Sequence, residues 1–211
     1  MDAAFFRAWL AEAGTVIESQ RDHLTQLDAA IGDADHGINL ARGFSAIAAA
    51  LDRTATPTPG SVLILAGSTL ISKVGGASGP LYGMALRQAG KALGDAADSG
   101  LPELAASLEA ALAGVQKLGA AREGEKTMVD ALAPAVAALH KSVSEGAGAA
   151  AALGAAAAAA AAGAQATISM QALKGRASYL GPRSVGHEDP GAASTAIIMG
   201  ALSEVARRQA T

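Results

Sequence analysis

Residues 5–31 read FFRAWLAEAGTVIESQRDHLTQLDAAI, and this stretch decides the fold class. Large apolar side chains recur in it every three to four positions, with Gln20 as the polar exception. That spacing places them along one face of a helix. The same period returns at residues 104–118 and 198–205, and no segment alternates apolar and polar residues over the length of a strand. The sequence therefore predicts an all-α protein.

Glycine and proline divide the 211 residues into eight expected helices. The boundaries fall at Gly32-Asp33, Pro57–Gly60, Gly75–Pro80, Gly100–Pro102, Gly119, about 145–147 and Asp189-Pro190. Pro134 is expected to kink the sixth helix or to mark a late start. Because the connections are short, neighbouring helices should run antiparallel, as in an eight-helix barrel or bundle. We expect residues 1–211 to form a single domain.

Composition excludes several classes of protein and site. The chain has no cysteine, which excludes disulfides and cysteine-based metal sites, and its net charge of -3 gives no indication of a nucleic-acid partner. The N-terminus lacks the basic region and apolar core of a signal peptide, so we expect a cytoplasmic protein. Residues 146–166 are rich in alanine. They predict a helix that neighbours can approach closely, although a codon bias towards alanine explains such a run equally well.

Glycines and polar residues gather in alternate loops. In an up-and-down arrangement, alternate loops lie at the same end of the molecule, so these loops should share one rim. They are residues 28–39, 75–80, 119–128 and 175–191. The opposite loops, near residues 53–59, 97–102 and 145–147, contain nothing that resembles a site.

The strongest local pattern is LDAAIGDADHG at residues 27–37. It places the carboxylates of Asp28, Asp33 and Asp35 in a glycine-rich turn, and carboxylates are the hard oxygen ligands that Mg²⁺ or Ca²⁺ prefers. An EF-hand is excluded, because the twelfth position is Asn39 or Phe44 and not the glutamate that such a loop needs. From these residues alone, an ordinary turn between two helices remains an equal alternative.

A second glycine-rich pattern and three charged or titratable residues accompany the aspartates. Residues 75–81 read GGASGPL, where small residues and the start of a helix would let a phosphate approach the backbone. This is neither a Walker A loop nor a dinucleotide-binding fingerprint, and a plain turn is the alternative. Arg176 is placed to neutralise phosphate charge. His36 and His187 adjoin acidic residues, so either is a candidate acid or base, or a hydrogen-bonded loop histidine.

The remaining charged loop, at residues 122–126, is expected to be solvated. Its charged residues are Arg122, Glu123, Glu125 and Lys126. Together with residues 127–130 it reads REGEKTMVD, which we expect to lead into the sixth helix.

Taken in order, the four motifs resemble the L-subunit family of dihydroxyacetone kinases, and the resemblance spans essentially the whole chain. The fourth motif is GRASYLG at residues 175–181 followed by GHEDPGA at 186–192. The resemblance implies an eight-helix barrel with a nucleotide at one rim, and two Mg²⁺ ions on Asp28, Asp33 and Asp35. It implies nucleotide contacts from His36, Gly37, Ile38, Asn39, Ala77, Ser78, Gly119, Met128, Arg176, Asp189, Pro190 and Gly191. One departure is the sequence EGE at residues 123–125, where the family often has Pro-Gly-Asp.

The resemblance also implies a function. Such a subunit carries ADP or ATP and transfers a phosphoryl group to dihydroxyacetone held on a separate K subunit. In the stand-alone form, a phosphocarrier subunit of the phosphoenolpyruvate-dependent phosphotransferase system rephosphorylates ADP in place, whereas fused members use free ATP. Two alternatives stay open: a kinase subunit for a related sugar or acyl substrate, and a non-catalytic nucleotide-binding partner of a regulator. No catalytic side chain is assigned in this chain.

Overall fold

The computed structural model describes residues 1–210 and contains helices but no β-strand in that range. Most helices begin and end close to a predicted boundary, except at the junction of the first two helices and at the end of the eighth. The helices are α1 (Ala3–Ser19), α2 (Arg21–Ile31), α3 (His36–Arg53), α4 (Pro59–Lys73), α5 (Ser78–Leu93), α6 (Leu101–Gly119), α7 (Val129–Ser144), α8 (Ala149–Ala166) and α9 (Pro190–Gln209). Two 3₁₀ segments, η1 (Thr167–Ser169) and η2 (Arg176–Ser184), lie between α8 and α9. The all-α prediction is confirmed.

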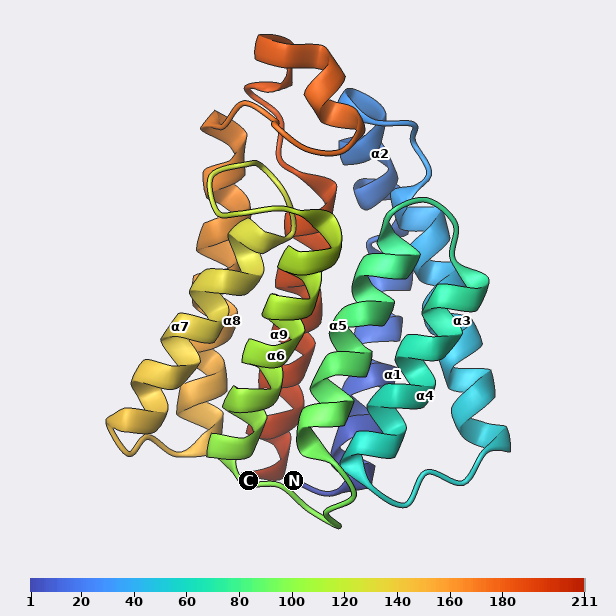
Figure 1. Ribbon diagram of the computed structural model, residues 1–211, viewed down its shortest axis with the longest axis vertical. Coiled ribbons are helices and arrows are strands. Elements are labelled where there is room, and N and C mark those ends of the chain that lie inside the picture. Colours follow the sequence, from blue (N-terminus) through green and yellow to red (C-terminus); the bar gives the residue numbers. More distant parts are fainter. Residues whose placement is uncertain (211) are drawn as a thin grey trace.

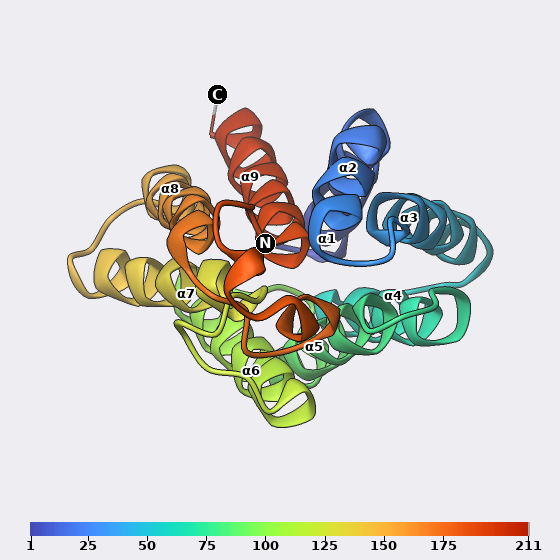
Figure 2. The ribbon, with the colours of Figure 1, turned by 90° about the horizontal axis from the view of Figure 1, so that it is seen from above.

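The long helices form a closed ring (Figures 1 and 2). Going round it, α1 packs on α3, the helices from α3 to α9 pack in chain order, and α9 packs back on α1. That is the predicted eight-helix barrel. The first helix differs from the prediction, because it is broken at Gln20 into α1 and α2. Helix α2 stands above α1 at the end of the barrel that also carries η2 (Figure 1).

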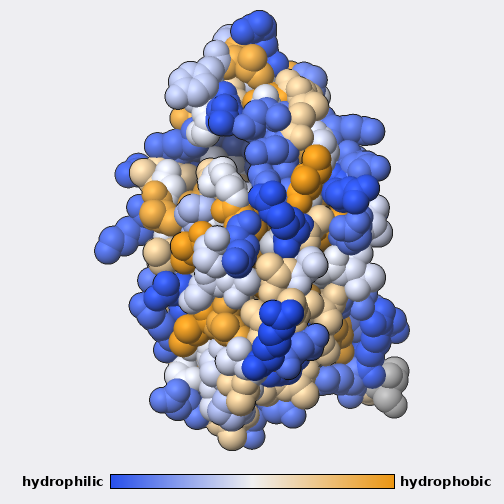
Figure 3. Space-filling model, turned by 90° about the vertical axis from the view of Figure 1, so that its right-hand side faces the viewer, coloured by the Kyte–Doolittle hydropathy of each residue, from blue (hydrophilic) through white to orange (hydrophobic). Residues whose placement is uncertain are grey.

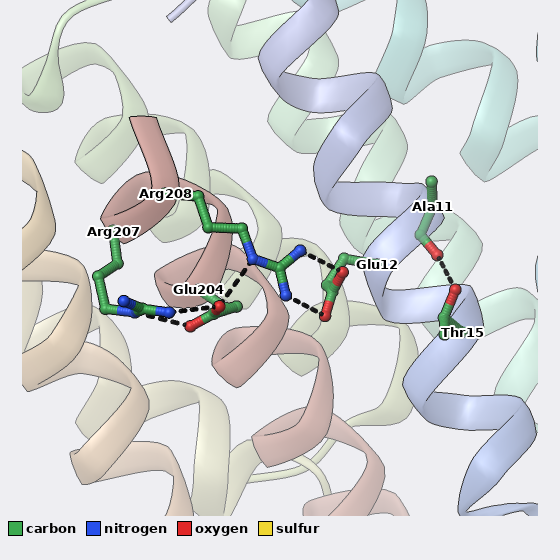
Figure 4. Close-up of polar contacts among 6 residues, drawn as sticks. All are labelled: Ala11, Glu12, Thr15, Glu204, Arg207 and Arg208. Atoms are coloured by element: carbon green, nitrogen blue, oxygen red, sulfur yellow. Dashed lines mark hydrogen bonds and ion pairs between the residues drawn. The ribbon is translucent and has the colours of Figure 1, made fainter. Parts of the chain in front are cut away.

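The first and last helices close the ring through buried and exposed contacts. Trp9 packs edge-on against Phe6 in the core, and its indole N–H donates to the carbonyl of Ile198 on α9 at 2.9 Å. Near the other end of α9, the Arg208 guanidinium reaches Glu12 of α1 at 2.9 Å and Glu204 at 2.7 Å (Figure 4). Burial of the aromatic side chains is the larger stabilising contribution, because exposed ion pairs are weakened by solvent.

The alanine-rich segment becomes α8, which packs between α7 and α9. By length and composition alone, residues 149–169 could cross a membrane, but the face with Leu153 is buried against the barrel. The close approach expected of this helix is present at Gly163, where a Cβ atom would lie 2.1 Å from the carbonyl oxygen of Asp130. Pro134 lies inside α7, which begins at Val129, so it does not delay the start of that helix.

The outer face over α3 and α4 shows hydrophobic side chains scattered among hydrophilic ones (Figure 3). Exposed apolar residues on α4 include Ile64 and Ile71. At the end of the barrel beneath η2, by contrast, side chains from several loops surround a hollow.

Candidate functional site

A pocket of about 390 Å³ opens at the end of the barrel that carries α2 and η2. That volume lies within the range of small-molecule sites. Its walls come from all four loops that were predicted to share one rim, as well as from the helices that flank them. The up-and-down connectivity explains this, because each of these loops follows a helix that runs towards the same end.

The three aspartates of the first loop converge on one point. One carboxylate oxygen from each of Asp28, Asp33 and Asp35 lies within 4.8 Å of the others. Asp28 Oδ2 accepts the backbone N–H groups of Asp35, at 2.8 Å, and His36, at 3.1 Å. Gly32 makes room for this arrangement, since a Cβ atom there would lie 1.9 Å from Asp28 Oδ1. The donor set is hard oxygen and suits Mg²⁺, which takes its remaining ligands from water and phosphate.

Arg176 reaches the same cluster from η2. Its guanidinium lies 3.0 Å from Asp33 Oδ2, and both side chains are more than a third exposed. The pair therefore contributes little to folding stability. It does place a fixed positive charge beside the carboxylates, at the mouth of the pocket.

The helices that begin at this rim direct their N-termini at the pocket. Lining residues include His36 of α3, Ser78 of α5, Val129 of α7 and Pro190 of α9, each at the first position of its helix. The helix dipole makes such positions favourable for anions, although Thr127 accepts the N–H of Val129 on α7 and the Asp189 carboxylate caps α9. Four of them around one pocket favour a polyanionic ligand.

Part of the pocket lining is apolar. Leu81, Val115, Met128 and Val129 belong to or pack against the main hydrophobic core, and Ile31 belongs to a second cluster with Ala172 and Ala177. An apolar wall beside an anion-binding wall fits a ligand that has both a flat organic part and a charged part.

A buried polar network supports the floor of the site. His36 Nε2 lies 2.8 Å from Ser194 Oγ, and the Tyr82 hydroxyl contacts Ser194, Thr195 and the carbonyl of Gly191 at 2.7, 2.8 and 2.9 Å. Burial lowers the pKa of His36, which Asp28 and Asp35 partly oppose, and burial raises the pKa of Tyr82. The network ties α3, which follows the aspartates, to α5 and α9.

Most residues expected at the site line this pocket. They are Asp28, Asp33, Asp35, His36, Ala77, Ser78, Gly119, Met128, Arg176, Asp189, Pro190 and Gly191. Three others lie outside its lining. Gly37 packs α3 on α2, Ile38 is 51% exposed over a shallow depression between α2 and α3, and the buried Asn39 side chain accepts from Arg42 at 2.7 Å.

The charged loop at residues 122–126 departs from the sequence-based expectation. Arg122 and Glu123 are exposed, as expected, but Lys126 is buried, with 1% of its surface accessible. Glu125 is half-buried, and its carboxylate accepts the backbone N–H of Arg122 at 2.8 Å. The expectation of a solvated Lys126 is wrong, because the side chain turns inward to reach backbone carbonyls of two other segments.

Sequence reasoning also missed Tyr82 and Lys174, which line the pocket. Tyr82 lies one residue beyond the GGASGPL motif, so its position in the first turns of α5 was the available signal. His187 is exposed, and only its carbonyl takes part in a contact near the site.

Comparison with known proteins agrees with this geometry. Residues 30–204 match the DAK2 domain. The chain belongs to the DAK2-domain family. It is 43% identical over 199 residues to the ADP-binding subunit DhaL of the PEP-dependent dihydroxyacetone kinase of Escherichia coli, covering 94% of this chain and 95% of that protein.

Longer members of the DAK2-domain family contain the same unit. The chain is 38% identical to triokinase/FMN cyclase of Rattus norvegicus, covering 95% of this chain and 35% of that protein. The crystal structure of the dihydroxyacetone kinase from C. freundii, in complex with AMP-PNP and Mg²⁺, superposes with a TM-score of 0.74 at 31% identity. That match covers 95% of this chain and 34% of the C. freundii chain, so the chain corresponds to about a third of these larger enzymes.

Proposed function

We propose that this chain is the nucleotide-binding subunit of a dihydroxyacetone kinase, and that its rim pocket holds ADP or ATP together with Mg²⁺. The observation that carries the proposal is the convergence of three aspartates and four helix N-termini on one pocket. The E. coli relative of matching length is named an ADP-binding subunit, and the C. freundii enzyme was crystallised with a nucleotide analogue and Mg²⁺. One continuous hydrophobic core from α1 to α9 supports treating the chain as one domain.

Each part of the pocket has a role in this proposal. Asp28, Asp33 and Asp35 would hold Mg²⁺, for which we propose two ions, and the apolar wall with Leu81 and Val115 would face the adenine. Bound Mg²⁺ would neutralise charge on the phosphates during transfer. The N-terminus of α5 would bind phosphate oxygens through backbone N–H groups, and Arg176 would add a positive charge. No side chain in the pocket is assigned as a general base.

We further propose that the acceptor reaches this rim on another subunit. The E. coli relative is named as a subunit of a PEP-dependent kinase, which supports a K subunit that carries dihydroxyacetone and a phosphotransferase-system subunit that rephosphorylates ADP. The nucleotide would then act as a bound cofactor. A system that uses free ATP would instead require ready exchange of the nucleotide.

The test begins with binding. Titration calorimetry should show MgADP binding to the wild-type chain and none to Asp33→Ala, with retention of the far-UV circular dichroism. Dihydroxyacetone phosphate should form only when the K subunit of the same organism is added, with either ATP or the phosphocarrier and phosphoenolpyruvate as donor. Absence of MgADP binding to the wild-type chain would sink the proposal. Exchange of bound labelled ADP over hours, and not seconds, would support the cofactor role.

A further inference from the structure

Lys126 is the one buried lysine among residues 1–210. Its backbone has a φ of 61°, in the left-handed region that lysine seldom adopts. A residue persists in that region where the surrounding contacts hold it there, which makes the contacts of this side chain informative.

The Lys126 ammonium holds two distant segments of the chain. Its Nζ atom donates to the carbonyl of Thr167, at 2.6 Å, and to the carbonyl of His187. These carbonyls flank residues 168–186, which we call the rim segment. The N–H of Gly186 donates to the carbonyl of Ile168 at 2.7 Å, and this bond joins the two ends of the rim segment beside the ammonium.

The rim segment supplies one wall of the pocket. Lys174, Gly175, Arg176 and Ala177 all line it, and Arg176 carries the charge that faces Asp33. A second contact with the charged loop steadies the segment, since the N–H of Leu173 donates to the Glu125 carbonyl at 3.1 Å.

The contacts of Lys126 continue to the start of α9. The Thr167 hydroxyl accepts the backbone N–H of Asp189 at 2.9 Å, and the Asp189 carboxylate accepts the N–H of Ala192 at 2.7 Å as the cap of α9. The carboxylates of Asp189 and Asp130 favour the charged form of the lysine, whose pKa burial lowers. The ammonium is thus the point where the charged loop, the end of α8 and the start of α9 meet.

We propose that Lys126 is a positioning residue for the nucleotide: its ammonium fixes both ends of the rim segment so that Arg176 and the α9 N-terminus face the aspartate cluster. This inference rests on the proposed nucleotide-binding function. Without the ammonium, the carbonyls of Thr167 and His187 lose their charge-assisted hydrogen bonds, and the two ends of the rim segment separate more often. Bound nucleotide then leaves faster, while Asp28 keeps the two backbone N–H groups that it accepts from Asp35 and His36.

The experiment compares three variants with the wild-type chain. Lys126→Met keeps a long apolar stem and removes the ammonium, while Leu139→Ala removes a fully buried side chain from the part of α7 distant from the pocket and serves as the matched control for lost stability. Lys126→Cys allows chemical rescue, because the chain has no other cysteine. Aminoethylation in denaturant followed by refolding restores an ammonium at almost the lysine position, and wild-type chain is taken through the same cycle.

Stopped-flow release of a fluorescent ADP analogue with Mg²⁺, measured well below the melting temperature of every form, gives the decisive quantity. Release should be about 10- to 100-fold faster for Lys126→Met, the range expected for loss of one charge-assisted hydrogen bond. It should be unchanged for Leu139→Ala and restored towards the wild-type rate by aminoethylation. Hydrogen exchange of residues 168–186 should rise in Lys126→Met and not in Leu139→Ala.

The outcomes separate this inference from the proposed function. If wild-type chain bound no MgADP, the proposed function itself would fail. If wild-type chain bound MgADP and Lys126→Met released it at the wild-type rate, or Leu139→Ala accelerated release equally, the positioning role would be overturned and the function would stand.

Discussion

Asp28 and Asp33 have the same proposed role as metal ligands but different roles in the fold, and a pair of alanine variants separates the two. Asp28 is buried, with 8% of its surface exposed, and its carboxylate accepts two backbone N–H groups from the turn that starts α3. Asp33 has a half-exposed side chain whose ion pair with Arg176 is also exposed. Both variants relieve repulsion within the carboxylate cluster to a similar degree, so that contribution largely cancels in the comparison.

The expected difference follows from the two hydrogen bonds. Hydrogen bonds to a charged group contribute about 1.5–3 kcal/mol each, and partial burial of this turn places the pair at about 2–4 kcal/mol together. The exposed Asp33 pair contributes at most about 1 kcal/mol. For a chain of this length, 1 kcal/mol corresponds to a shift of about 2–4 °C in melting temperature. The difference of about 1–4 kcal/mol means that Asp28→Ala should melt roughly 2–16 °C below Asp33→Ala.

Differential scanning fluorimetry in EDTA without nucleotide measures that gap. Added Mg²⁺ and ADP should then raise the melting temperature of the wild-type chain and of neither variant, because each lacks one ligand of the cluster. Equal melting temperatures in EDTA would refute the structural role of Asp28. A full MgADP-induced shift in either variant would refute its role as a metal ligand.

Further predictions concern the packing of α8 and the cap of α9. Gly163→Ala should destabilise the chain by about 2–4 kcal/mol in urea unfolding, because its Cβ would overlap the Asp130 carbonyl, whereas Gly154→Ala, whose nearest neighbour is 3.9 Å away, should be neutral or stabilise by up to about 1 kcal/mol. Burial raises the pKa of Asp189 from 3.8 to about 7, so the folded chain binds this proton more tightly than the unfolded chain. That stability is present below about pH 4 and lost as pH rises through about 7, so the wild-type advantage over Asp189→Asn should shrink by up to roughly 4 kcal/mol from acid to neutral pH. A gap independent of pH would show that folding does not raise the pKa of Asp189.

Helical periodicity was sufficient to predict the helices, because an apolar stripe at a spacing of three to four fixes which face each helix buries. The short connections predicted a bundle or barrel, and the family resemblance implied the barrel. The break at Gln20 was not predictable in the same way. Residues 5–31 keep one apolar stripe across it and have no proline there, so the only local signal was the polar residue itself. In the structure, Gln20 leaves the helical region and its N–H still bonds to Val16, which lets α2 tilt away from α1 over the rim.

The residues of the site likewise fall into two groups: those that neighbouring sequence predicts, and those whose position depends on distant parts of the chain. Asp28, Asp33 and Asp35 were visible in the sequence because they lie within eight residues of one another, and connectivity alone predicted that the four loops share one rim. Lys126 was not, because the carbonyls that bury its ammonium belong to residues 41 and 61 positions further along the chain. In a loop with four charged residues, nothing local distinguishes the lysine that turns inward from its solvated neighbours. Only the packing of α8 and α9 against the loop supplies that difference, and it places the buried charge where the rim segment begins and ends.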